Sequence, residues 1–196
     1  AKIFFFMEQD YSNCRRRVKK RNNIKFKIIM NIIGITGSIA SGKTTVAQLM
    51  AGKKYPLFSA DRVVSNLYNK KKFIKILIKK FKLNPNKKIK EQIKLIIKKN
   101  RKNIRTLELI IHPLVRQEMK IFLKKKNRFL FLEIPLLFES KLKKFFDKVI
   151  FVDAKKKIRF KRYLKRDGKL KTFNLLDNRQ LSSTFKKRMC DYTINN

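Results

Sequence analysis

The chain has 196 residues, with 53 Lys and Arg against 13 Asp and Glu, a formal net charge of +40, and 43% apolar and 11% aromatic residues. The length fits one domain, and the apolar content excludes a wholly disordered chain, because disordered chains lack the side chains that offset chain entropy. The charge leaves two explanations open, lysine-rich codon bias or an anionic partner such as nucleic acid, an acidic membrane or a polyanionic substrate.

Residues 1–29 are typical of a basic extension outside the fold. They include the run Arg15–Arg17 and show neither the alternation of a strand nor a sustained helical period. A targeting segment is the alternative, but Lys25 and Lys27 interrupt its apolar stretch and no small-residue cleavage site follows. We expect folding to begin at Met30 and the folded domain to span residues 30–196.

A phosphate-binding loop follows between a strand and a helix. Residues 31–36 are a short apolar run, residues 37–44 match GxxxxGK[ST], and residues 45–51 form a helical segment closed by Gly52. The glycines let backbone N–H groups turn toward phosphate oxygens, and the helix adds its positive dipole end. We expect the phosphates of ATP to lie against Gly37, Ser38, Ile39, Ala40, Ser41, Gly42, Lys43, Thr44 and Thr45.

Two side chains of this loop have specific expected roles. Lys43 is expected to bridge the β- and γ-phosphates, and the Thr44 hydroxyl to bind Mg²⁺. The loop does not identify the phosphoryl acceptor. Residues 69–72 lack the aspartate of the guanine-reading motif Asn-Lys-x-Asp, which argues against a GTPase.

A second strand is predicted at residues 55–59, and Asp61 stands just past its carboxyl end. Open α/β sheets gather their ligands at that edge, so Asp61 is a candidate general base. The alternative is an N-cap for the helix that begins at Arg62, a common use of aspartate. The position alone does not separate these two roles.

Three helical stripes of apolar residues are predicted next, and we expect them to be mostly core. The stripes are Phe73, Ile74, Leu77, Ile78 and Phe81, then Ile89, Ile93, Ile96 and Ile97 after a break at residues 84–86, then Ile104, Leu107, Ile111 and Leu114. His112 is the one histidine of the chain, so it cannot form a zinc site and either contacts substrate or has a structural role.

Two further buried strands are predicted at residues 128–132 and 147–153, and Pro135 ends the first. Strands separated by helices indicate a doubly wound parallel α/β sheet. Beyond them, Arg162 and Arg166 fall four residues apart on one predicted helix face. They either offset the charge of a transferred phosphoryl group from a lid or belong to a solvated basic face.

Together these motifs resemble the dephospho-CoA kinase family over residues 30–196. The segments IHPLV at 111–115 and EIPLLFE at 133–139 are specific to that family. The other matches are residues 34–44, 59–61, 107–108, 152–153 and 166–168, Arg162, Gln180, Lys186 and residues 191–196.

The resemblance implies a P-loop NTPase-type α/β fold, with a helical substrate-binding insertion at about residues 63–115 and a lid at about residues 158–180. It implies ATP-dependent phosphorylation of the 3′-hydroxyl of the dephospho-CoA ribose, which gives CoA and ADP. The implied residues are Asp61, Lys43 and Arg166 for catalysis, Asp61, His112 and Arg116 for the acceptor, Arg162 and Asn196 with the loop for ATP, and Thr44 with Glu133 for Mg²⁺.

Two other functions stay open from the sequence. Another nucleoside or nucleotide kinase would share the P-loop, and a nucleic-acid-binding protein would explain the charge, although the aromatics follow apolar core patterns rather than a basic stripe. Cys14 and Cys190 form no CxxC pair and lysines interrupt every apolar run, which predicts a soluble cytoplasmic protein without a membrane partner. We also expect a monomer with no specific nucleic-acid partner, and the resemblance implies a helix beyond Asn196.

Overall fold

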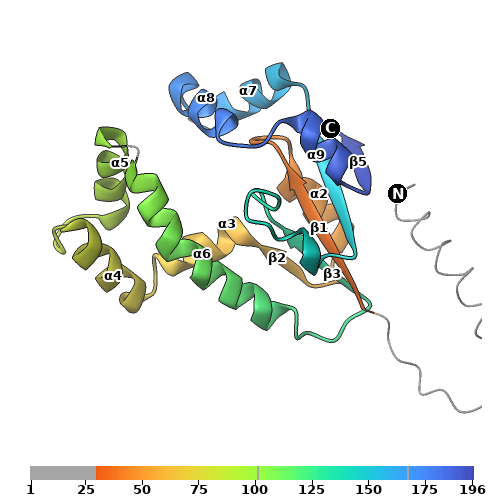
Figure 1. The fold of residues 1–196 in the computed structure, drawn as a ribbon, viewed down its shortest axis with the longest axis horizontal. Helices are drawn as coiled ribbons and strands as arrows, with labels where there is room; N and C mark the ends of the chain where they lie inside the picture. Colours follow the sequence, from red (N-terminus) through yellow and green to blue (C-terminus); the bar gives the residue numbers. More distant parts are fainter. Residues whose placement is uncertain (1–29, 101, 167) are drawn as a thin grey trace, which may run out of the picture.

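A parallel five-stranded sheet, in the order β2-β3-β1-β4-β5, forms the centre of the computed structural model (Figure 1), which describes residues 30–100, 102–166 and 168–196. Its strands are β1 (Asn31–Gly37), β2 (Leu57–Ser59), β3 (Phe129–Glu133), β4 (Lys148–Asp153) and β5 (Tyr192–Asn195). The predicted parallel α/β fold is confirmed. The extension predicted at residues 1–29 lies outside the described residues.

The two faces of the sheet carry separate cores, because successive side chains of a strand point to opposite faces. Phe129 and Phe131 of β3 pack with Ile33 and Ile35 of β1 beneath α2 (Lys43–Ala51). The alternate residues Leu130 and Leu132 pack on the other face against α3 (Ala60–Leu67), α6 (Lys102–Phe122) and the short helix η1 (Lys143–Phe145). A strand buried on both faces is apolar throughout, which is why β3 could be predicted from the sequence.

A third core lies beside the sheet, among the helices between β2 and β3. It joins α3 and α6 to α4 (Lys71–Phe81) and α5 (Ile89–Lys99), and its buried members are Leu67, Phe73, Leu77, Leu83 and Ile93. The first two predicted stripes contribute Phe73, Leu77 and Ile93 to its buried centre, which confirms their interpretation as core. The third stripe only partly fits that interpretation, because Ile104, Leu107 and Ile111 also line the cavity described below. Since the C-terminal half of α6 also packs on the sheet, this one helix links the helical group to the strands.

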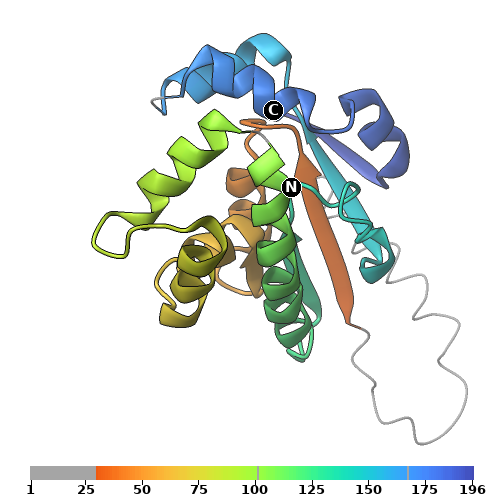
Figure 2. The ribbon, with the colours of Figure 1, turned by 60° about the vertical axis from the view of Figure 1, so that its left-hand side comes forward.

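The helices after β4 lie on the opposite side of the strand ends from α5 and α6 (Figures 1 and 2). They are α7 (Lys156–Leu164), α8 (Leu170–Asn178) and α9 (Ser183–Met189). None of the helices in the described part of the chain has the length and apolar content needed to cross a bilayer.

The prediction that Arg162 and Arg166 share one helix face is wrong. Helix α7 ends at Leu164, because the backbone N–H groups of Arg166 and Gly168 both donate to the carbonyl of Tyr163, at 3.1 and 3.2 Å. Arg166 therefore stands in the turn after the helix and points its side chain independently of Arg162.

Candidate active site

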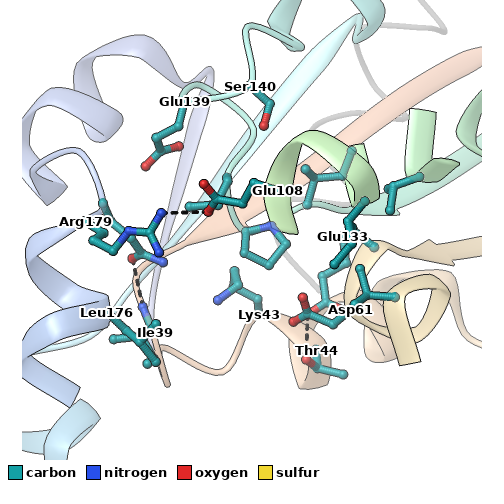
Figure 3. A pocket seen from close by; sticks show the side chains of 18 of the residues that line it. Ile39, Lys43, Thr44, Asp61, Glu108, Glu133, Glu139, Ser140, Leu176 and Arg179 are labelled. Atoms are coloured by element: carbon teal, nitrogen blue, oxygen red, sulfur yellow. Dashed lines mark hydrogen bonds and ion pairs between the residues drawn. The ribbon is translucent and has the colours of Figure 1, made fainter. Parts of the chain in front are cut away.

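A cavity of about 710 Å³ lies at the carboxyl ends of the strands, between the P-loop, α6 and the segment from α7 to α9 (Figure 3). This is the edge at which open α/β sheets bind ligands. The predicted site residues that line it are Ile39, Ala40, Gly42, Lys43, Thr44, Thr45, Asp61, His112, Arg116, Glu133 and Arg166. Those outside its lining are Gly37, Ser38, Ser41, Arg162 and Asn196.

The P-loop curves sharply between β1 and α2. Ala40 and Gly42 have positive φ angles of 56° and 93°, and the Ser41 N–H donates to the Ser38 carbonyl at 3.2 Å. Left-handed residues of this kind make the concave backbone in which N–H groups surround an anion. The loop leads directly into the N-terminus of α2, which adds its dipole to the same place.

Lys43 is the buried cation of this loop, with 8% of its surface exposed. Its ammonium donates to the Ser38 carbonyl at 3.1 Å. Burial lowers the pKa of the ammonium below its usual value, and the nearby carboxylates of Asp61 and Glu133 act in the opposite direction. The buried ammonium thus has one hydrogen bond in place of the water that it loses on burial. A phosphate would supply further hydrogen-bond acceptors and a compensating negative charge.

Asp61 stands in the first turn of α3 and lines the same cavity as Lys43 (Figure 3). The alternative role of Asp61 as an N-cap is wrong, because Ser59 occupies the N-cap position. Burial raises the pKa of the Asp61 carboxyl, the repulsion of Glu133 adds to this, and Lys43 lowers it. A carboxylate whose pKa lies above its usual value is a better proton acceptor near neutral pH.

Glu133 lies at the end of β3, beside the start of α2, and only 1% of its surface is exposed. Its Oε1 accepts a hydrogen bond of 2.6 Å from the Thr44 hydroxyl. Its Oε2 is buried and has no hydrogen-bond partner among the described residues. Such an atom is destabilising unless a ligand satisfies it, so the residue is poised for a donor or a cation.

Arg162 and Asn196 approach the P-loop from outside the cavity. Both donate to the Ser41 carbonyl, Arg162 at 3.3 Å and the Asn196 amide at 2.9 Å. The Asn196 amide also occupies the space beside Gly42 that a Cβ atom would need. These two residues therefore fix the loop at its tip, between Ser41 and Gly42.

Replacing Gly42 with Ala is expected to weaken MgATP binding by at least about tenfold and to lower stability by about 1–2 kcal/mol, because a left-handed residue with a Cβ is strained and the Asn196 amide must also move. Gly52 is a matched control, since it too has a positive φ but open space around it. Gly52→Ala should show the stability loss without the binding loss. Calorimetric titration with MgATP and urea unfolding measure both; equal affinities of the two variants would contradict the prediction.

Polar residues of α6 form a stripe along the cavity wall that faces the P-loop. Glu108, His112 and Arg116 are spaced four residues apart, so they lie on one face of the helix, and all three line the cavity. Arg116 donates to the Ser140 carbonyl at 3.4 Å. Glu108 accepts a 2.7 Å hydrogen bond from Arg179, which follows α8 on the opposite wall.

The segment from α7 to α9 makes hydrogen bonds to the backbone of the P-loop. Arg159 is 5% exposed, pairs with Asp177 at 2.6 Å and donates to the Ile39 carbonyl at 3.3 Å. The Ile39 N–H donates to the side-chain oxygen of Gln180 at 3.1 Å. Sequence analysis missed the role of Arg159, because a basic residue on a lysine-rich helix gives no signal of burial.

A second buried ion pair lies near the same segment. The Lys186 ammonium is fully buried in α9 and lies 2.8 Å from Glu139 Oε1, in a geometry that makes no hydrogen bond. The same carboxylate oxygen accepts the Leu181 N–H at 2.9 Å. Glu139 therefore ties the connection between α8 and α9 to the loop that follows β3, which forms part of the cavity wall.

The cavity does not share the basic character of the whole chain. Its lining contains four basic side chains, Lys43, Arg116, Arg166 and Arg179, and four acidic ones, Asp61, Glu108, Glu133 and Glu139. Their formal charges cancel, whereas the chain as a whole has a charge of +40. The excess of lysine therefore lies outside the cavity lining. The high net charge of the chain is thus not explained by attraction of a polyanionic substrate to this cavity.

The chain is similar to known proteins over most of its length. The model of the family described as dephospho-CoA kinase matches residues 31–196. A dephospho-CoA kinase from Bartonella quintana is 35% identical over 173 residues, which cover 85% of this chain and 89% of the relative. Among solved structures, TT1252 from Thermus thermophilus has a TM-score of 0.71 at 27% identity, and a dephospho-CoA kinase from Campylobacter jejuni has a TM-score of 0.57 at 26% identity. Each comparison covers 85% of this chain and 88% of the solved one.

Proposed function

The chain belongs to the dephospho-CoA kinase family, and from this membership we propose that it transfers the γ-phosphoryl group of ATP to the 3′-hydroxyl of the dephospho-CoA ribose. The observation that carries the proposal is the meeting of Lys43, Asp61 and Glu133 in one cavity between the P-loop and α6. A phosphate-binding cation and a proton acceptor at one place are what phosphoryl transfer to a hydroxyl requires.

In the proposed reaction the 3′-oxygen of the acceptor forms a bond to the γ-phosphorus while the bond from that phosphorus to the β,γ-bridging oxygen breaks. ADP leaves with the bridging oxygen, and the proton of the hydroxyl passes to the Asp61 carboxylate. Lys43 exchanges the Ser38 carbonyl for phosphate oxygens as ATP enters. Its charge then stabilises the negative charge that spreads over the transferred group.

The residues beside Thr44 fit a magnesium ion. Within residues 30–100, 102–166 and 168–196, no group of three His, Cys, Asp or Glu side chains is arranged to hold a metal. Mg²⁺ commonly binds through one or two protein oxygens, with phosphates and water completing its shell. The Thr44 hydroxyl and the buried, unsatisfied Oε2 of Glu133 are such oxygens. When bound there, the ion would neutralise phosphate charge, and Glu133 would orient its water ligands or the Thr44 hydroxyl.

The proposed function is tested by incubating the purified protein with MgATP and dephospho-CoA and following the formation of CoA and ADP. Nucleoside monophosphates serve as alternative acceptors in parallel reactions. Of these acceptors, we expect the protein to phosphorylate only dephospho-CoA. Phosphorylation only of a nucleoside monophosphate would instead show that the chain is a nucleotide kinase.

Replacing Arg166 with Ala is expected to reduce kcat by about 10²-fold or more, because arginines positioned at a transferring phosphoryl group contribute strongly to the rate. Arg166 lines the cavity, and its side chain is exposed, with no ion pair to another described residue. Stability should change little, since the side chain is exposed. Lys165→Ala removes the neighbouring exposed charge outside the cavity lining and is the control. Equal losses of kcat in the two variants would assign Arg166 to the solvated basic face.

We also propose that the protein acts as a cytoplasmic monomer. The residues proposed for the donor, the acceptor and the proton transfer all come from one chain, so the site needs no second copy. Cys190 is the cysteine among the described residues, and it forms no disulfide there. Light scattering at micromolar concentration measures the mass in solution.

A further inference from the structure

We propose that Arg179 is a further substrate-binding residue, whose guanidinium binds the phosphate chain of a substrate, and that Glu108 holds it across the cavity until that substrate arrives. This inference rests on the proposed function for the identity of the two substrates, ATP and dephospho-CoA. Both carry a phosphate chain, so the shared chemistry is a di- or triphosphate.

The place of Arg179 is fixed beside the nucleotide loop. The next residue, Gln180, accepts the N–H of Ile39 in the P-loop, which ties the backbone of Arg179 to that loop. From there its side chain reaches Glu108 on α6, on the far wall of the cavity (Figure 3). The guanidinium therefore spans the space between the nucleotide loop and the helix that carries His112 and Arg116.

The contact between Arg179 and Glu108 is easily exchanged. The two side chains are 36% and 31% exposed, and ion pairs of that exposure contribute little to stability. One nitrogen of Arg179 donates to one oxygen of Glu108. Among the described residues, the guanidinium makes this one hydrogen bond. A phosphate can accept two bonds from the planar fork, so exchange of the carboxylate for a phosphate increases the number of charged hydrogen bonds.

The charge balance of the cavity supports the same exchange. The other acidic residues of the lining have their own charged neighbours, since Asp61 and Glu133 lie near Lys43 and Glu139 lies beside Lys186. Glu108 has Arg179. A polyanion that enters a lining with no net charge needs cations that are not fully neutralised. Arg166 has no carboxylate partner among the described residues, and Arg179 becomes a second such cation when it leaves Glu108.

The test compares two variants whose expected effects have opposite signs. Arg179→Met should raise the Kd and KM of one substrate about tenfold, the usual loss for a charged hydrogen bond that is partly exposed. Glu108→Gln should lower the same constants by about threefold, because the competing carboxylate is gone while the amide oxygen can still hold the guanidinium. Arg179→Lys should lie between wild type and Arg179→Met, since it keeps the charge without the fork. In all three, kcat should change less than KM.

Titration calorimetry with ATP, dephospho-CoA and inorganic pyrophosphate, each alone, shows which phosphate chain Arg179 binds, and steady-state kinetics give KM and kcat. A shift in the affinity for ATP or for dephospho-CoA supports the proposal and identifies the donor or the acceptor. Unchanged affinities for both, or shifts of the same sign in Arg179→Met and Glu108→Gln, overturn it, because a purely structural bridge would respond equally to the loss of either end.

Two controls remove equivalent charges away from the cavity. Arg188 is an exposed residue of α9 and Glu91 an exposed residue of α5, and neither lines the cavity. Arg188→Met and Glu91→Gln should leave all affinities unchanged, and thermal unfolding checks that every variant folds. If the wild-type protein binds ATP but does not phosphorylate dephospho-CoA, the proposed function fails, whereas the affinities of Arg179→Met for ATP and pyrophosphate still decide the role of Arg179.

Discussion

Replacing Asp61 with Asn is expected to lower kcat by about 10²–10⁴-fold, the usual contribution of a general base. Asparagine has nearly the same shape but cannot accept the proton of the acceptor hydroxyl. The affinity for MgATP should stay within about threefold of wild type, because phosphate binding is assigned to the P-loop and Lys43. Single-turnover kinetics and calorimetric titration separate the two quantities. Glu118→Gln, which removes a carboxylate of α6 outside the cavity lining, is the control.

The pH dependence of this variant gives an independent check. Burial raises the pKa of Asp61 in the folded protein above its value in the unfolded chain. The ionised carboxylate therefore destabilises the fold above the folded pKa, and this loss of stability shrinks as the pH falls from the folded pKa to the lower pKa of the unfolded chain. Asp61→Asn should be at least as stable as wild type at neutral pH. It should also lose the acid limb of the kcat profile, and a variant that keeps both kcat and the acid limb would exclude Asp61 as the base.

Replacing Lys43 with Met is expected to lower kcat/KM for ATP by about 10²–10³-fold, the usual effect of removing one charge-stabilising donor from an active site. Methionine fills similar space without the ammonium. Lys53→Met, in the exposed turn after α2, removes a charge that does not line the cavity and should leave kcat/KM unchanged. If both variants bind and turn over ATP as wild type does, the P-loop lysine has no role in the reaction.

The same variant should alter the titration of its neighbour. Lys43 lowers the pKa of Asp61, so its removal leaves burial and the repulsion of Glu133 unopposed. The acid limb of the remaining activity should then move to higher pH. Burial lowers the pKa of the Lys43 ammonium, so removing this charge relieves a destabilisation of the fold at neutral pH. Its removal also takes the counter-charge from Asp61 and Glu133, and because the two effects oppose each other, Lys43→Met should unfold at a temperature close to that of wild type.

The parts of the fold that could be predicted from the sequence are those set by local patterns. β1, β3 and β4 are continuous apolar runs, and α4, α5 and the first half of α6 carry apolar residues at helical spacing. β5 was not predicted, because Tyr192–Asn195 is short and only half-buried, and its pairing with β4 makes it a strand. The end of α7 was missed as well, since it depends on two backbone bonds to one carbonyl.

The residues of the candidate site also fall into those that local sequence patterns identify and those that only the folded structure reveals. Lys43, Thr44 and Asp61 stand in short motifs at strand ends, so their sequence neighbours identify them. Glu108 could have been added, because it lies four residues before His112 on the same helix face. Its partner Arg179 is 71 residues away, and the partner of Glu139 is Lys186. No spacing in a single sequence reveals pairs that only the folded chain brings together.

The attachment of the P-loop to the last part of the chain has a consequence for how the protein is made. The Ser41 carbonyl binds Asn196, which is 155 residues further along, and Ile39 binds Arg159 and Gln180. During translation the loop emerges early, but the contacts with Arg159 and Gln180 need the chain through α8, and the contact with Asn196 needs the chain through β5. Contacts of such long range slow folding. A nascent chain is thus expected to acquire affinity for ATP late. Because a ligand that binds only the native state stabilises it, cellular ATP would favour chains that have folded through β5 over partly folded ones.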